Sequence, residues 1–287
     1  MPANSDALEV CRDCGGTGWV ASADDPNRVA RCSCRRRSNV DRLLRDAGLP
    51  PRYHACTLQQ FSTSHPDPVC RAQLLRAVSV CRRYIDDFLS DREDLRFRDS
   101  GLLLTGPYGS GKTHLAVATL RELIATYRVR GRFVDFTSLV QDLQSAIDPD
   151  APFSRNELLA PVENAEVLVV DELGAQTLRP WAADVLYDLI NRRYARRLPT
   201  LFTTNYKLDD PAARNEAPTA DRAAAELEAA GRESGGRGRD STMGGSSLLS
   251  RRIPGMLVSR LWEMAQVVSL DAVKDYRMEV CSHQHGV

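Results

Sequence analysis

The side chains with the clearest chemistry in this 287-residue sequence lie in the run Gly-Pro-Tyr-Gly-Ser-Gly-Lys-Thr at residues 106–113. This run fits the spacing G-x-x-x-x-G-K-[ST], in which backbone N–H groups of a loop converge on phosphate oxygens. Glycines let such a loop curl around an anion without Cβ clashes. A helix beginning near the lysine would add the positive end of its dipole. The run therefore predicts a binding site for a nucleoside triphosphate, and a chance glycine turn is the weaker alternative.

The side chains of this loop are expected to have different roles in binding the nucleotide. Lys112 supplies a cation to the β- and γ-phosphates and is expected to be catalytic, and the Thr113 hydroxyl is expected to bind Mg²⁺. The residues expected to contact the nucleotide are Gly106, Pro107, Tyr108, Gly109, Ser110, Gly111, Lys112, Thr113 and His114.

Two carboxylates follow an apolar run further along the chain. Ala165-Glu-Val-Leu-Val-Val leads directly into Asp171 and Glu172, as expected for a buried parallel strand whose carboxyl end meets the ligand. We expect Asp171 to hold Mg²⁺ through a water, and Glu172 to activate the water that attacks the γ-phosphate. Asn205 ends another apolar run and is expected to reach the γ-phosphate or that water, with Thr203 and Thr204 as less favoured contacts. A strand that simply ends in polar residues is the alternative.

The surrounding periodicity predicts the elements that position these residues. Apolar runs indicate strands at 101–104, 131–136, 165–170, 198–204 and 267–270. Helical spacing of apolar residues indicates helices at 39–49, 69–90, 114–124, 139–147, 156–160, 179–197 and 255–265. Thr137 or Ser138 is the expected cap of the fourth of these helices. The fold class is therefore α/β, with a domain at 69–287 behind an extended linker at 50–68.

A cysteine-rich module is expected at residues 1–49. Cys11 and Cys14 have the C-x₂-C spacing, and Cys32 and Cys34 can complete a tetrahedral four-sulfur zinc site. The C-x-C spacing of the second pair departs from a standard zinc ribbon, and free cysteines are the alternative. The arginines at 35–37 fit a solvated face and a contact with nucleic acid phosphate or an acidic partner equally well.

Composition further limits the classes of protein to which this chain can belong. Lys plus Arg and Asp plus Glu both total 38, so net charge gives no support for nucleic acid binding. No apolar stretch is long enough to span a membrane, and the first residues lack the features of a secretory signal. We therefore expect a cytoplasmic protein with reduced thiols. Residues 209–247 are rich in Ala, Glu, Arg, Gly and Ser without aromatic residues, which predicts a flexible insertion.

Four segments together resemble one family. The loop with its following His-Leu-Ala, Val169-Val-Asp-Glu-Leu-Gly174, Thr203-Thr-Asn205 and Val258-Ser-Arg-Leu-Trp-Glu-Met264 are similar to the DnaC/DnaI helicase loaders and the related IstB transposition ATPases, which are AAA+ proteins. The resemblance covers about residues 50–287, apart from the insertion.

This resemblance implies a five-stranded parallel sheet with helices on both faces and a nucleotide at a subunit junction. Arg260 would be the arginine finger that reaches a neighbour's γ-phosphate, where it would offset developing charge. Arg277 would match the sensor-2 position. The chain ends soon after the last strand, so the helical lid of AAA+ proteins is expected to be reduced or absent.

The resemblance further implies a slow ATPase that loads the replicative hexameric helicase in DNA replication. The zinc module would bind the helicase, and the AAA+ domain would bind ATP, self-associate and contact single-stranded DNA. One alternative is an IstB-type transposition helper. Another is an adaptor that uses ATP as a switch without significant turnover, against which the Asp171 and Glu172 pair argues.

Overall fold

The protein is described here from a computed structural model, which covers residues 33–88, 101–146, 152–176, 178–208 and 248–273, with Arg12, Thr17, 19–21 and 29–31. Several sequence predictions lie outside these residues, namely Cys11, Cys14, Cys32, the side chain of Cys34, Arg277 and the insertion at 209–247. The zinc site and the sensor-2 position therefore stay predictions.

The core is a five-stranded parallel sheet. Its strand order is β4 (Gly131–Asp135), β5 (Val167–Asp171), β6 (Thr200–Thr204), β3 (Leu102–Thr105) and β7 (Gln266–Ser269). Every pair of neighbours runs parallel, so each connection must cross over the sheet. The carboxyl ends of all five strands consequently meet at one edge. This confirms the predicted α/β class and the parallel sheet.

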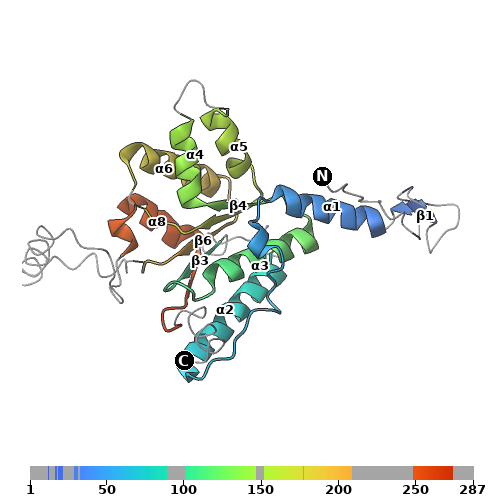
Figure 1. The fold of residues 1–287 in the computed structure, drawn as a ribbon, viewed down its shortest axis with the longest axis horizontal. Helices are drawn as coiled ribbons and strands as arrows, with labels where there is room; N and C mark the ends of the chain where they lie inside the picture. Colours follow the sequence, from blue (N-terminus) through green and yellow to red (C-terminus); the bar gives the residue numbers. More distant parts are fainter. Residues whose placement is uncertain are drawn as a thin grey trace, which may run out of the picture.

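Helices cover both faces of this sheet (Figure 1). One face carries α1 (Ser33–Asp46), α2 (Pro68–Asp86) and α3 (Lys112–Tyr127), and the other carries α4 (Phe136–Ser145), α5 (Arg155–Glu163), α6 (Pro180–Ala195) and α8 (Gly255–Met264). Successive strand residues point to opposite faces: Leu102 and Leu104 belong to one core cluster, and Leu103 belongs to the other. Burial on both sides explains why the strands read as continuous apolar runs.

Two helix starts differ from the sequence prediction. The α4 helix begins at Phe136, and its cap is Asp135, whose carboxylate accepts a hydrogen bond from the Ser138 N–H at 2.7 Å. The prediction of Thr137 or Ser138 as the cap was wrong, because an aspartate at the strand end is at least as good an acceptor. The α1 helix begins at Ser33 rather than near residue 39, since arginine is a good helix former.

The segment between α1 and α2 is fastened to the domain. It contains a short 3₁₀ helix, η1 (Pro51–Tyr53), and then the buried side chains of Cys56 and Leu58. The Arg121 guanidinium of α3 donates to the carbonyls of His54 and Cys56. This segment therefore lies against α3 and takes part in the core rather than spanning open solvent.

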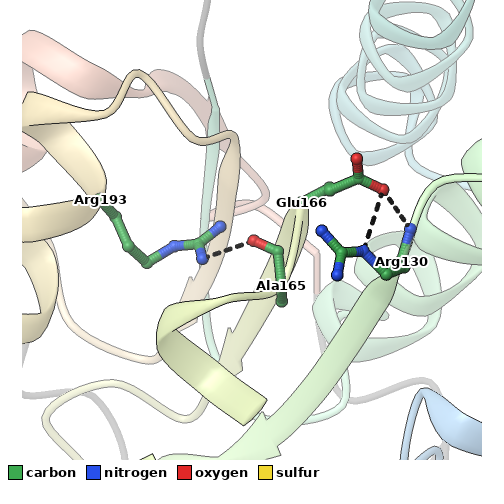
Figure 2. Close-up of polar contacts among 4 residues, drawn as sticks. All are labelled: Arg130, Ala165, Glu166 and Arg193. Atoms are coloured by element: carbon green, nitrogen blue, oxygen red, sulfur yellow. Dashed lines mark hydrogen bonds and ion pairs between the residues drawn. The ribbon is translucent and has the colours of Figure 1, made fainter. Parts of the chain in front are cut away.

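The amino-terminal edge of the sheet is closed by a buried arginine. Arg193 of α6 is 1% exposed and donates to the carbonyls of Val162, Ala165 and Pro199 and to the Thr200 hydroxyl. Figure 2 shows its contact with Ala165 beside a second pair, in which Glu166 accepts from the backbone N–H of Arg130 at 2.7 Å. Burial lowers the pKa of Arg193 to about 9, so the guanidinium is charged at neutral pH.

The amino-terminal module contributes a small antiparallel hairpin, β1 (Trp19–Ala21) paired with β2 (Val29–Arg31). Within the part of the chain that the structure describes, no three His, Cys, Asp or Glu side chains gather as a metal site. The same described residues include no helix that is long and apolar enough to cross a membrane.

Candidate nucleotide-binding site

The phosphate loop follows β3 and leads directly into α3. Gly106, Gly109 and Gly111 all have positive φ, and Gly111 at +92° is also the cap residue of α3. A Cβ at Gly111 would lie 2.5 Å from the Phe61 ring, so both its backbone and its surroundings require glycine. Lys112 curls back over the loop, where its Nζ donates to the carbonyls of Gly106 (2.9 Å) and Pro107 (2.6 Å). These contacts hold the ammonium group at the centre of the loop.

The predicted magnesium ligands Thr113 and Asp171 lie in contact, although they are far apart in sequence. The Thr113 hydroxyl donates to the Asp171 carboxylate at 2.9 Å. Asp171 is the last residue of β5 and is 5% exposed. Burial raises the pKa of Asp171, while hydrogen bonds from Thr203 and Thr113 oppose that rise. A hydroxyl and a carboxylate are oxygen ligands of the kind that Mg²⁺ prefers, so the residues fit the ion.

Thr203 of β6 connects the two acidic residues. Its hydroxyl donates to Asp171 Oδ1 at 2.5 Å and accepts from the Glu172 backbone N–H at 3.0 Å. Glu172 has a left-handed backbone with φ of 58°, a conformation that costs energy for a residue with a side chain and that recurs at functional sites. The Thr203 hydroxyl thus fastens the backbone that carries the predicted general base.

A cavity of about 290 Å³ opens over this network. It brings together the predicted residues Lys112, Thr113, Glu172 and Asn205, and Thr203 lies in its wall as well. Tyr108, which is 60% exposed, and His114 extend the same wall. The further lining residues are Arg52, Tyr53, Gly109 and Gly111.

A second, mainly apolar cavity of about 220 Å³ lies on the other side of the phosphate loop. The two cavities share Gly109, Gly111 and His114. Phe61 lines the second one and meets the His114 ring edge-on, with the ring centroids 5.4 Å apart. Leu74 of α2 and Val273 after β7 complete its apolar wall.

Arg260 lies elsewhere, on α8. Its guanidinium carbon is 4.3 Å from the centroid of the Tyr194 ring, and its Nη1 is 3.4 Å from the Glu263 carboxylate. The side chain is 32% exposed, and it is not among the described residues that line the 290 Å³ cavity. The structure therefore does not bring Arg260 to the phosphate loop of its own chain.

Sequence reasoning missed three participants. Thr203 was ranked below Asn205, although its position at the end of an apolar run was a usable signal. Arg52 and Tyr53 were assigned to a linker, and no local pattern indicated that they line the cavity. Their place follows only from the way that the segment packs on α3.

The fold and the site define the class of protein. A parallel sheet of this order, a phosphate loop after β3 and a buried acidic residue at the end of β5 form a P-loop nucleotide-binding domain of the AAA+ class. Residues 87–217 match the family described as IstB-like ATP binding protein.

Known proteins with similar sequences agree with this match. The replicative helicase loader DnaC of Escherichia coli (strain K12) is 26% identical over 178 residues, which span 61% of this chain and 65% of that protein. An insertion sequence ATP-binding protein of Sinorhizobium fredii is 32% identical over 190 residues, covering 63% of this chain and 54% of that one.

The solved structures include a similar one as well. A crystal structure of the DnaC helicase loader superimposes with a TM-score of 0.52 and 27% identity, covering 77% of this chain and 99% of that chain. Residues 87–217 therefore resemble an IstB-like ATP-binding domain, and the chain is similar in sequence and fold to the DnaC helicase loader.

Proposed function

We propose that this protein is an ATP-hydrolysing loader of a replicative hexameric helicase. The observation that supports the proposal most directly is the hydrogen-bonded set of Thr113, Asp171 and Thr203, of which Thr113 and Thr203 line the same cavity as Lys112. Such an arrangement can bind a triphosphate with Mg²⁺ and place a carboxylate beside the terminal phosphate. The helicase as partner rests on similarity to the DnaC and DnaI loaders.

This geometry supports the following proposed roles of the residues in hydrolysis. The loop N–H groups and Lys112 bind the β- and γ-phosphates, and Thr113 and Asp171 hold Mg²⁺. The ion, when bound, neutralises charge on the phosphate oxygens. Glu172 accepts a proton from the attacking water, and Asn205 orients that water or the γ-phosphate. The second cavity, with the Phe61 ring and Leu74 in its wall, suits the nucleotide base.

Self-association is part of the proposal because the site lacks an arginine from α8 of its own chain. Arg260 from a neighbouring subunit would supply the positive charge that offsets charge on the transferred phosphoryl group. Hydrolysis by an isolated subunit should then be slow. The present contacts of Arg260 are with the Tyr194 ring and with the exposed Glu263. Both contacts are weak enough for Arg260 to exchange them for a phosphate.

We propose that the two parts of the chain have the separate functions that the sequence predicts. Residues 1–49, with a zinc ion on Cys11, Cys14, Cys32 and Cys34, would bind the helicase. Residues 69–287 would bind ATP and single-stranded DNA, with Arg277 near the nucleotide and 209–247 as an insertion. Metal analysis of protein purified without chelators tests the zinc component separately.

The decisive experiment is size-exclusion chromatography of the full chain with the host's replicative helicase, with and without ATP and single-stranded DNA. We expect a stable complex, and we expect a Cys11→Ser/Cys14→Ser variant to lose it. A Lys112→Ala variant is the matched control that tests whether complex formation depends on nucleotide. It is suitable because the Lys112 ammonium group is bonded within the phosphate loop. Failure to form a complex under every condition would refute helicase loading.

A transposition helper is the second candidate function. It is favoured by the 32% identity to an insertion sequence ATP-binding protein and by the name of the matching family. The discriminating partner is a transposase in place of the helicase in the same chromatography. An ATP-switched adaptor is a third reading, which the Glu172→Gln variant described below tests.

A further inference from the structure

Two residues that line the nucleotide cavity have no role in the proposed function. Arg52 and Tyr53 come from η1, in the segment between α1 and α2, and they line the cavity together with Thr113, Glu172 and Asn205. The cationic side chain of Arg52 is exposed. It borders the same cavity as the side chains assigned to the terminal phosphate.

Tyr53 holds this wall in place. Its ring packs against Phe133 of β4, with centroids 6.3 Å apart, and both Tyr53 and Thr113 line the cavity. Burial raises the pKa of Tyr53, the positive charge of Arg52 opposes that rise, and the charge of Asp171 adds to it. Tyr53 is therefore protonated at neutral pH, and it interacts electrostatically with both Arg52 and Asp171.

The backbone on either side of Arg52 is anchored as well. The His54 ring is 2.9 Å from the Leu49 carbonyl, and the His114 ring is 2.9 Å from the Thr57 carbonyl. With the contacts of Arg121 to the same segment, these bonds fix the position from which the Arg52 side chain extends. Its guanidinium carbon lies 5.0 Å from the centroid of the Tyr53 ring, which is within the range of a cation–π contact.

On this basis we propose that Arg52 binds the terminal phosphate of ATP in cis, with Tyr53 as the residue that positions it. The inference rests on the proposed ATP-binding function and adds a residue to it. A guanidinium suits this role because its planar fork can donate two hydrogen bonds to phosphate oxygens. ADP has no γ-phosphate, so Arg52 distinguishes ATP from ADP.

Because Arg52 lies close to α1 in the chain, its contact with the phosphate also affects the segment that precedes it. Residues 47–50 are all that separate α1 from η1, and α1 falls within the cysteine-rich module predicted at residues 1–49. Hydrolysis removes the group that Arg52 binds, and so frees the Arg52 side chain while the backbone of η1 stays anchored. The contact thereby couples the state of the nucleotide to the segment that leads to the amino-terminal module.

Calorimetric titration of the full chain with Mg²⁺ and either ADP or a non-hydrolysable ATP analogue tests this assignment. We expect Arg52→Ala to weaken analogue binding about ten-fold or more, the usual effect of losing a charge-assisted hydrogen bond, and to change ADP binding less than about two-fold. Arg52→Lys should be intermediate because it keeps the charge without the fork. Arg76→Ala, at an exposed position on α2 outside the cavity, is the matched control.

The outcomes separate this inference from the proposed function. Equal losses of analogue and ADP affinity in Arg52→Ala, or no loss of either, would overturn the role of Arg52 while ATP binding by the wild type stands. Wild-type protein that binds neither nucleotide would overturn both. Unfolding in urea should show the same midpoint for Arg52→Ala as for the wild type, since an exposed side chain contributes little to stability.

Discussion

The most informative single substitution is Thr203→Val, which removes a hydroxyl and preserves the shape of a side chain that is 1% exposed. Two hydrogen bonds are lost together. The Asp171 carboxylate loses a donor at 2.5 Å, and the Glu172 backbone N–H loses its acceptor at 3.0 Å. The substitution therefore tests whether one hydroxyl supports both acidic residues.

The expected cost in stability can be estimated from these contacts. A hydrogen bond to a charged group is worth roughly 1.5–3 kcal/mol, and leaving a buried N–H unsatisfied costs roughly 1–3 kcal/mol. The added methyl group returns about 0.8 kcal/mol. The net loss in the free energy of unfolding should be about 3 kcal/mol, which lowers the melting temperature by roughly 6–12 °C in a domain of this size.

Hydrolysis should fall for a separate reason. Without its acceptor, the Glu172 backbone is free to leave the left-handed conformation, and a small misplacement of a general base costs about 100-fold in rate. Thermal unfolding and steady-state ATP hydrolysis, measured well below the melting temperature, give the two readouts.

The neighbouring residue provides the matched control. Thr204 is fully buried, and its hydroxyl donates to the Leu173 carbonyl at 2.7 Å and accepts from the Tyr206 N–H. Thr204→Val should cost about 1–2 kcal/mol, because both of its bonds are to neutral groups, and it should leave hydrolysis unchanged. Equal loss of hydrolysis in the two variants, or wild-type stability in Thr203→Val, would refute the reasoning.

Three further substitutions have distinct expected outcomes. Glu172→Gln should lower turnover by roughly 10²–10³-fold with unchanged ATP binding, as expected for a general base; unchanged turnover would favour the ATP-switched adaptor. Burial raises the pKa of Asp171 in the folded protein, so the free energy of unfolding falls as the pH rises from about 4, the unfolded value, through the folded value. Asp171→Asn should therefore have a higher urea midpoint than the metal-free wild type at pH 7, a gap that closes near pH 4, while it weakens the Mg²⁺ dependence of ATP binding. Arg193→Ala should lose about 3 kcal/mol or more, because it leaves buried carbonyls unpaired, yet retain the hydrolysis rate at low temperature; a large loss of rate without loss of stability would contradict this structural role.

The parts of the site that the sequence predicted share one property. Lys112, Asp171 and Asn205 each follow an apolar run that is long enough to be a buried strand, and parallel strands end at a common edge. Local sequence therefore contains both the chemistry of these residues and their approximate position. Their proximity in the structure follows from the sheet alone.

The parts that were missed depend on pairings between distant segments. Thr203 contacts Asp171 because β5 and β6 are neighbours in the sheet, and the strand order cannot be obtained from either run by itself. Arg52 reaches the cavity because residues 50–58 pack on α3. The cap of α4 was missed for a different reason: Asp135 ends a strand, and one residue served two elements.

The two edges of the sheet differ in how well their polar groups are bonded. At the carboxyl edge, Asp171 is a buried acid with a raised pKa, and Glu172 has an unfavourable backbone conformation. At the amino edge, Arg193 donates four hydrogen bonds to groups that belong to different elements. The unfavourable burial and backbone conformation of the predicted metal and phosphate site are thus placed at one end of strands whose other end is tightly bonded. Because the two ends are joined by rigid, fully buried strands, the site can keep its unfavourable charges and geometry without loosening the fold that positions them.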